Sequence, residues 1–316
     1  MSEKIRVGIS SCLLGERVRF DGGHKHDRYI TDTLGQYFDF VPVCPEVECG
    51  LGTPRESMHL EGDPGAPRLV TSRTRIDLTE RMQTWARRRV EQLEPEGLCG
   101  FTFKANSPSS GMERVKVLDA HGVPRRNGTG LFAAAFKRHF PLLPTEEEGR
   151  LHDPGLRESF IERVFALRRW RDFLAARPRR GGLVAFHAAH KLQLLAHSPV
   201  LYRELGRLVA DLKALPAPEL FARYQIGFLE ALEKQATRRK HVNVLQHMAG
   251  TFRRQLSADE KQELVEVIRQ YGEGHAPLVV PITLLRHYVR KHDQPYLREQ
   301  TYLCPHPLEL ALRNHA

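Results

Sequence analysis

The spacing of apolar residues changes once along the chain, and this change limits the possible folds more than any other feature. Before residue 143, short apolar runs alternate with segments of helical spacing, whereas beyond residue 155 apolar residues recur every three or four positions. The sequence therefore predicts an α/β domain over residues 1–145 and an all-helical domain over residues 150–316, with the linker in residues 143–155. Seven helices are expected in the second domain, over residues 156–176, 182–198, 199–215, 218–236, 238–256, 257–274 and 276–292.

Alternating strand and helix segments in the first domain predict a Rossmann-like, mainly parallel sheet with helices on its faces. Ligands bind at the carboxyl ends of the strands in such sheets. Cys12, Cys44 and the polar loop KANSPSS (104–110) each follow a predicted strand, so we expect them to converge at one edge. The expected strands lie in residues 4–11, 39–46, 97–104 and 113–119, and the expected helices in residues 26–38, 77–94 and 128–140.

The start of the chain has no apolar core preceded by positive charge, and no apolar run approaches the roughly 20 residues of a membrane helix. These features favour a cytoplasmic protein with no membrane partner. Five cysteines in a reducing compartment are expected to be thiols, and their odd number also argues against a disulfide framework.

Three of these thiols are candidate metal ligands: Cys12, Cys44 and Cys49. The last two are separated by four residues rather than two, and no second pair matches them, which argues against a zinc knuckle. Three thiolates with no fourth protein ligand suit a 4Fe–4S cluster that has one open iron. Buried structural cysteines are the alternative, because cysteine is among the most buried residue types.

Several segments resemble known proteins. The segments SSCLLGERVRFDGG (10–23), CPEVECGLGTPRE (44–56) and FKANSPSSGMERVKV (103–117) resemble those that define the thiouracil desulfidase family. The second half is similar to a helical domain of unknown function often fused to that family, through residues 186–199, 238–250 and 296–314. The fused arrangement resembles bacterial desulfidases that convert 4-thiouridine in tRNA to uridine, which implies tRNA as the partner and sulfide as a product.

The resemblance also implies a 4Fe–4S cluster held by three cysteines, with the substrate sulfur bound at the fourth iron. Cys12 and Cys44 match two of these ligands. The family's usual SPSCG is SPSSG here, so Ser110 stands where a cysteine is expected, while Cys49 stands where short family members usually have glycine. We hypothesise that Cys49 is the third ligand. Ser110 is the alternative, and Cys99 is a further candidate.

By the same resemblance, Glu46 is expected to be the catalytic acid or base and Ser107 to position substrate or water. The open iron would draw electron density from the C4=S group, water would attack C4, and Glu46 would take the proton. Further candidates for the surroundings of the site lie in the same motifs: Asp21, Lys25, Arg55 and Lys104.

Positive charge is concentrated in the second domain. Residues 1–150 hold 22 Lys and Arg against 21 Asp and Glu, whereas residues 151–316 hold 26 against 17. Such an excess is typical of a solvated helical surface or of a domain that binds a polyanion, and together with interspersed aromatic residues it favours RNA. The candidate RNA contacts are Lys104, Arg55, Arg238, Arg239 and Lys240.

Two other functions are compatible with the sequence. The first is a desulfidase of free thiouracil or of thiouridine nucleosides or nucleotides. The second is a non-catalytic, metal-stabilised RNA-binding protein. A metal site at His187 and His190, three residues apart on one helix, is not favoured because no cysteine or carboxylate completes the set.

Overall fold

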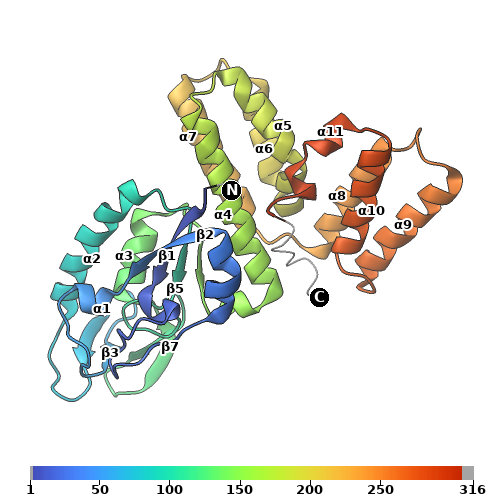
Figure 1. Cartoon of the computed structure of the whole chain (residues 1–316). Coiled ribbons are helices and arrows are strands. Elements are labelled where there is room, and N and C mark those ends of the chain that lie inside the picture. Colours follow the sequence, from blue (N-terminus) through green and yellow to red (C-terminus); the bar gives the residue numbers. More distant parts are fainter. Residues whose placement is uncertain (1–2, 308–316) are drawn as a thin grey trace. The chain divides into compact units, whose positions relative to one another are not determined.

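The structure is a computed structural model, and it describes residues 3–307 (Figure 1). The chain divides into two compact units, one ending at Phe160 and the other beginning at Ile161. No helix in the described part of the chain is long and apolar enough to cross a membrane.

The first sheet of the α/β unit, as described within residues 3–160, contains four parallel strands in the order β2–β1–β5–β8. The strands are β1 (Ile5–Ser10), β2 (Phe38–Val43), β5 (Phe101–Phe103) and β8 (Thr145–Glu147). The central strand β1 buries Val7 and Ile9 completely. Gly8 lies so close to β5 that a Cβ there would be 2.2 Å from the Phe101 ring. The predicted α/β fold with a parallel sheet is confirmed.

Helices α2 (Thr79–Leu93) and α3 (Leu131–His139) pack together beside this sheet (Figure 1). Phe132 of α3 connects the layers, because its ring centroid lies 5.2 Å from that of Trp85 in α2 and 5.8 Å from that of Phe101 in β5. Offset and edge contacts between aromatic rings add to the free energy of burying their apolar surface. The predicted apolar face of α2 is buried: Leu78, Met82, Trp85, Val90 and Leu93.

The three successive glutamates at 146–148, which the sequence analysis assigned to a linker, belong to the α/β unit. Glu146 and Glu147 are buried residues of the edge strand β8, and Glu148 directly follows it. Two of the three carboxylates accept hydrogen bonds from loop N–H groups: Glu147 Oε1 accepts from Met112 N at 2.7 Å, and Glu148 Oε2 accepts from Ala105 N at 2.6 Å. The expectation of a linker here was wrong because buried loop N–H groups need acceptors, and these carboxylates supply them.

A second sheet has the order β4–β3–β6–β7, and of its strands only β6 (Val115–Leu118) was expected. Strand β6 pairs in parallel with β3 (Met58–Glu61) and antiparallel with β7 (Pro124–Gly128). Strand β4 (Arg68–Thr71) lies antiparallel to β3. The expected helix over residues 26–38 is instead a π-helical turn at Tyr29–Thr33 and a 3₁₀ turn at Leu34–Gln36. Gly35 and the β-branched residues before it disfavour a regular helix.

All seven helices expected in the second half are present. Trp170 and Tyr224 are completely buried and stacked, with ring centroids 5.3 Å apart. A second cluster of buried residues includes Leu245, Met248 and Phe252. The helices are α4 (Pro154–Ala175), α5 (Arg180–His197), α6 (Pro199–Ala210), α7 (Ala217–Glu233), α8 (Arg238–Thr251), α9 (Ala258–Glu273) and α10 (Val279–Lys291), followed by the short α11 (Pro295–Arg298).

Candidate active site

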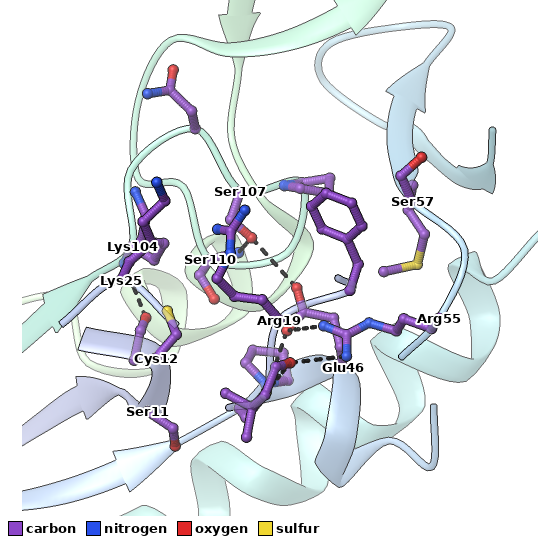
Figure 2. Close-up of a pocket in the computed structure, with 18 of the residues that line it drawn as sticks. Ser11, Cys12, Arg19, Lys25, Glu46, Arg55, Ser57, Lys104, Ser107 and Ser110 are labelled. Atoms are coloured by element: carbon purple, nitrogen blue, oxygen red, sulfur yellow. Dashed lines mark hydrogen bonds and ion pairs between the residues drawn. The ribbon is translucent and has the colours of Figure 1, made fainter. Parts of the chain in front are cut away.

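The carboxyl ends of β1, β2 and β5 meet at one cavity of about 360 Å³ (Figure 2). Strand β1 leads to Cys12, β2 leads to Cys44 just before the short helix α1 (Pro45–Glu48), and β5 leads to the loop 104–110. Cys12, Cys44 and that loop all line the cavity, as the order of parallel strands predicts. Its size is at the lower end of the range of small-molecule sites.

The loop 104–110 is held by the beginning of α3. Phe132 N donates to Ser109 O at 2.9 Å, and Gly130 N donates to Gly111 O at 2.8 Å. A Cβ at Gly130 would lie 2.5 Å from the Ser109 carbonyl group, so this close approach requires glycine. Because the loop carbonyl oxygens satisfy the free N–H groups of the helix end, the backbone that carries the serines is fixed.

Glu46 lies at the centre of a hydrogen-bonded group of side chains. Its Oε1 accepts from Ser109 Oγ at 2.5 Å and from Ser107 Oγ at 3.5 Å. Its Oε2 lies 3.8 Å from Arg55 Nη2 and 3.6 Å from Cys44 Sγ, and the Glu46 side chain is only 13% exposed. Dashed lines in Figure 2 mark contacts of this group. The arrangement places one anchored carboxylate beside a cavity that also contains a thiol.

Ser109 was missed by the sequence analysis, although it is completely buried and makes the shortest of these contacts. Ser107 and Ser109 also share a 2.9 Å hydrogen bond, so the two hydroxyls and the carboxylate form one network. The only signal in the sequence was a third serine inside the motif that contains Ser107 and Ser110.

Two cations of the cavity are held by specific partners. Arg55 Nη1 donates to Val18 O at 2.9 Å. Lys104 is paired with Glu148 and donates to Ala105 O at 2.9 Å, so the glutamate that follows β8 positions a cavity lysine.

Of the other candidates for the surroundings of the site, Lys25 lines the cavity, whereas Asp21 is outside the lining and lies 3.5 Å from Arg19. Arg19 and Phe20, which the sequence analysis did not single out, are in the lining.

The thiols differ in their positions. Cys12 and Cys44 are buried in the lining, and burial raises the pKa of Cys12 to about 11 and that of Cys44 to about 12. Cys49 lies at the end of α1, outside the lining, and its Sγ donates to Glu46 O at 3.3 Å. Ser110, by contrast, is 3% exposed and lines the cavity. Cys99 is buried outside the lining.

An iron–sulfur cluster prefers thiolate ligands. Two thiols of the lining, Cys12 and Cys44, fit such a cluster, and the Ser110 hydroxyl belongs to the same lining. Among residues 3–307, no three His, Cys, Asp or Glu side chains form a group that could hold a metal ion. The raised thiol pKa values mean that a metal would have to displace protons from both cysteines on binding.

Two protein-family profiles match segments of this chain. The profile of the family described as 2-thiouracil desulfurase matches residues 7–148, and that of a protein family of unknown function, DUF1722, matches residues 191–307. The chain belongs to the thiouracil desulfurase family, with a DUF1722 domain attached. The cavity, its two thiols and Glu46 all lie within the desulfurase match.

Two individual proteins are similar to parts of this member of the thiouracil desulfurase family. The uncharacterized protein YbgA of Escherichia coli (strain K12) is 32% identical over 158 residues, which is 50% of this chain and 94% of YbgA. A solved structure described as the 4Fe–4S-dependent thiouracil desulfidase TudS is 29% identical and covers 48% of this chain and 95% of its own, with a TM-score of 0.40.

The RNA candidates of the helical unit are not equivalent in the structure. Arg238 and Arg239 are exposed, and Arg238 lies 6.0 Å from the Tyr271 ring. Lys240 Nζ donates to His197 O at 2.7 Å and to Gln235 O at 2.9 Å, so it has a structural role.

The helical unit supports neither a base-stacking role for its central aromatics nor the disfavoured histidine site. Trp170 and Tyr224 are core residues, completely buried. His187 Nδ1 lies 3.1 Å from Tyr224 Oη, and His190 Nδ1 lies 2.7 Å from Phe186 O, so internal groups use one ring nitrogen of each.

Proposed function

We propose that this member of the thiouracil desulfurase family is an iron–sulfur-dependent desulfidase that converts 4-thiouridine in tRNA to uridine and releases sulfide. The observation that carries the proposal is the anchored carboxylate of Glu46, which lies in one cavity with the thiols of Cys12 and Cys44. A hydrolytic replacement of sulfur needs a base for water and a soft ligand set for a metal that binds sulfur.

The chain's own residues have distinct tasks in this reaction. A 4Fe–4S cluster, when bound at Cys12 and Cys44, would supply a Lewis acid for the thiocarbonyl sulfur. Glu46 accepts a proton from the water that attacks C4, while Ser107 and Ser109 hold its carboxylate in position. The balance is one C=S group and one water in, one C=O group and one H₂S out, so no electrons are consumed.

We assign the third cluster position to Ser110 rather than to Cys49. The Ser110 hydroxyl shares the cavity lining with both thiols, whereas the Cys49 thiol is outside the lining and bonded to a carbonyl oxygen. Serine is a weaker ligand than cysteine because its hydroxyl is far less acidic. Burial at 3% exposure and a backbone fixed by α3 compensate in part by holding the oxygen in place.

The choice of tRNA over the free base is supported by the charge of the second half. Residues 151–316 carry 26 Lys and Arg against 17 Asp and Glu, an excess that attracts the phosphates of RNA. The description of TudS as a thiouracil desulfidase favours the free base as the second candidate substrate. We place the protein in the cytoplasm, where tRNA is found and thiols stay reduced.

The test is to purify the protein without oxygen, measure iron and sulfide, and incubate it with thiolated tRNA. Nucleoside analysis should show loss of 4-thiouridine and gain of uridine, and Glu46→Gln should reduce the rate about 10²- to 10⁴-fold. Turnover of free thiouracil with no turnover of tRNA would favour the second candidate. Protein that contains zinc and no iron, and that converts neither substrate, would contradict both.

A further inference from the structure

The helical unit contains a basic cavity that the proposed desulfidase chemistry does not use. It lies along α10, the end of α11 and the segment that follows, and its lining includes three arginines, Arg286, Arg290 and Arg298, together with Gln300. No Asp or Glu is part of this lining. The positive potential of the cavity is therefore not cancelled by acidic groups in its own wall.

Gln300 is the most informative residue of this cavity. It is only 3% exposed, and its Nε2 donates to Ala188 O at 2.8 Å and to Tyr296 O at 3.3 Å. Because only the NH₂ group can donate to two carbonyl oxygens, these contacts fix which end of the amide is which. Its Oε1 is then left buried with no hydrogen-bond partner among the described residues. A buried acceptor of this kind normally receives a donor, and none of residues 3–307 supplies one.

Arg286 and Arg290 also have no partner among the described residues. They lie four residues apart on α10, a spacing that places them on the same face of the helix, and neither forms an ion pair within residues 3–307. Arg298, the third arginine, is paired with Asp293. Two like charges at this spacing destabilise a helix slightly, and a bound anion would remove that cost.

We propose that this cavity binds a ribose–phosphate unit of an RNA strand, with the phosphate on Arg286 and Arg290 and the ribose 2′-hydroxyl donating to Gln300. Planar guanidinium groups match phosphate oxygens in geometry as well as charge. The 2′-hydroxyl is the donor that distinguishes RNA from DNA. The inference rests on the proposed action on RNA, and it names a site in the helical unit that takes part in holding the substrate.

The test measures binding of the full-length protein to an RNA stem-loop without thiouridine, by fluorescence anisotropy at several salt concentrations. The double variant Arg286→Ala/Arg290→Ala should weaken binding at least about tenfold and lower the salt slope by about 1 to 2. The control Arg253→Ala/Arg254→Ala removes the same charge from exposed positions outside this cavity and should weaken binding less than about threefold. Equal losses in the two double variants would overturn the site.

A second arm changes the ligand and leaves the protein unaltered, so it does not depend on how a variant folds. DNA of the same sequence should bind at least about fivefold more weakly than RNA, because the 2′-hydroxyl contact is missing. Equal affinity for RNA and DNA would overturn the role of Gln300. If inorganic phosphate or a free nucleotide fills the cavity at micromolar concentration and RNA does not compete, the site serves a small anion and the proposal fails.

The outcome is separable from that of the proposed function. Turnover of free 4-thiouridine should be unchanged in Arg286→Ala/Arg290→Ala, because both residues lie outside the desulfurase match at residues 7–148. A protein that binds RNA as described and desulfurates nothing would leave the site standing and contradict the proposed reaction. If the protein desulfurates tRNA and the double variant does so equally well, the proposed reaction stands and the RNA site is contradicted.

Discussion

The hydrogen bond from Ser109 to Glu46 provides a direct test of the role assigned to the carboxylate. The Oγ–Oε1 distance is 2.5 Å, Ser109 is completely buried, and the Glu46 side chain is 13% exposed. A hydrogen bond to a charged group contributes about 1.5–3 kcal/mol, and water has little access to replace it. Since about 1.4 kcal/mol is a factor of ten, Ser109→Ala should reduce the rate of desulfuration about 10- to 150-fold.

The effect should depend on the carboxylate, which a double-mutant cycle measures. Glu46→Gln alone should cost about 10²- to 10⁴-fold, and adding Ser109→Ala to it should cost less than about threefold more. The assay is single-turnover release of sulfide from free 4-thiouridine by anoxically reconstituted protein, with iron content and thermal unfolding measured in parallel. Thr84→Ala, which removes an exposed hydroxyl of α2, is the control and should leave the rate unchanged. Fully additive losses would refute the view that Ser109 acts through Glu46.

Three further predictions concern the cluster and the helical unit. Ser110→Ala should lower the affinity for the cluster by more than the roughly 10- to 100-fold cost of losing an outer partner of a metal ligand. Iron and sulfide content after reconstitution should therefore fall in Ser110→Ala and be retained in Cys49→Ser. The reverse result would assign the third position to Cys49. Removal of iron with a chelator should abolish desulfuration and leave RNA binding within about twofold, and a parallel loss of both would contradict separate sites. Burial works to lower the pKa of His197, but the carboxylate of Glu162 at 3.2 Å and hydrogen bonding outweigh it and raise the pKa. The resulting stabilisation is fully present below a pH of about 6.5 and is lost as the pH rises through the raised pKa, so urea unfolding of the helical unit should become easier from pH 6 to 9, and Glu162→Gln should flatten this dependence.

Much of the fold follows from local patterns in the sequence. The 3.6-residue period identified all seven long helices within residues 154–307, because each buries one apolar face, and α2 behaves in the same way. The meeting of Cys12, Cys44 and the loop 104–110 followed from the rule for parallel strands, without knowledge of side-chain contacts.

The elements that the sequence did not predict correctly lie where tertiary contacts decide the structure. Strands β3 (MHLE), β4 (RLVT) and β7 (PRRNG) contain charged or turn-forming residues, so no apolar run or regular alternation distinguishes them from loop sequence. The glutamates 146–148 suggested solvent, yet their partners Met112, Ala105 and Lys104 lie more than 30 residues away in sequence.

The role of Ser109 was not predicted for the same reason, because its partner Glu46 is 63 residues away in sequence. For the third donor, the sequence could count thiols but could not say which of them the cavity reaches.

The bonding of the loop to the beginning of α3 has a consequence for protein engineering. Main-chain hydrogen bonds at Ser109 and Gly111, and the tight approach of Gly130, set where the backbone of the loop lies. The side chain at residue 110 can therefore be changed without moving the backbone of the loop. Replacing oxygen by sulfur there through Ser110→Cys would give two proteins that differ by one atom in an unchanged scaffold, and comparing their iron content in air would test the role proposed for residue 110.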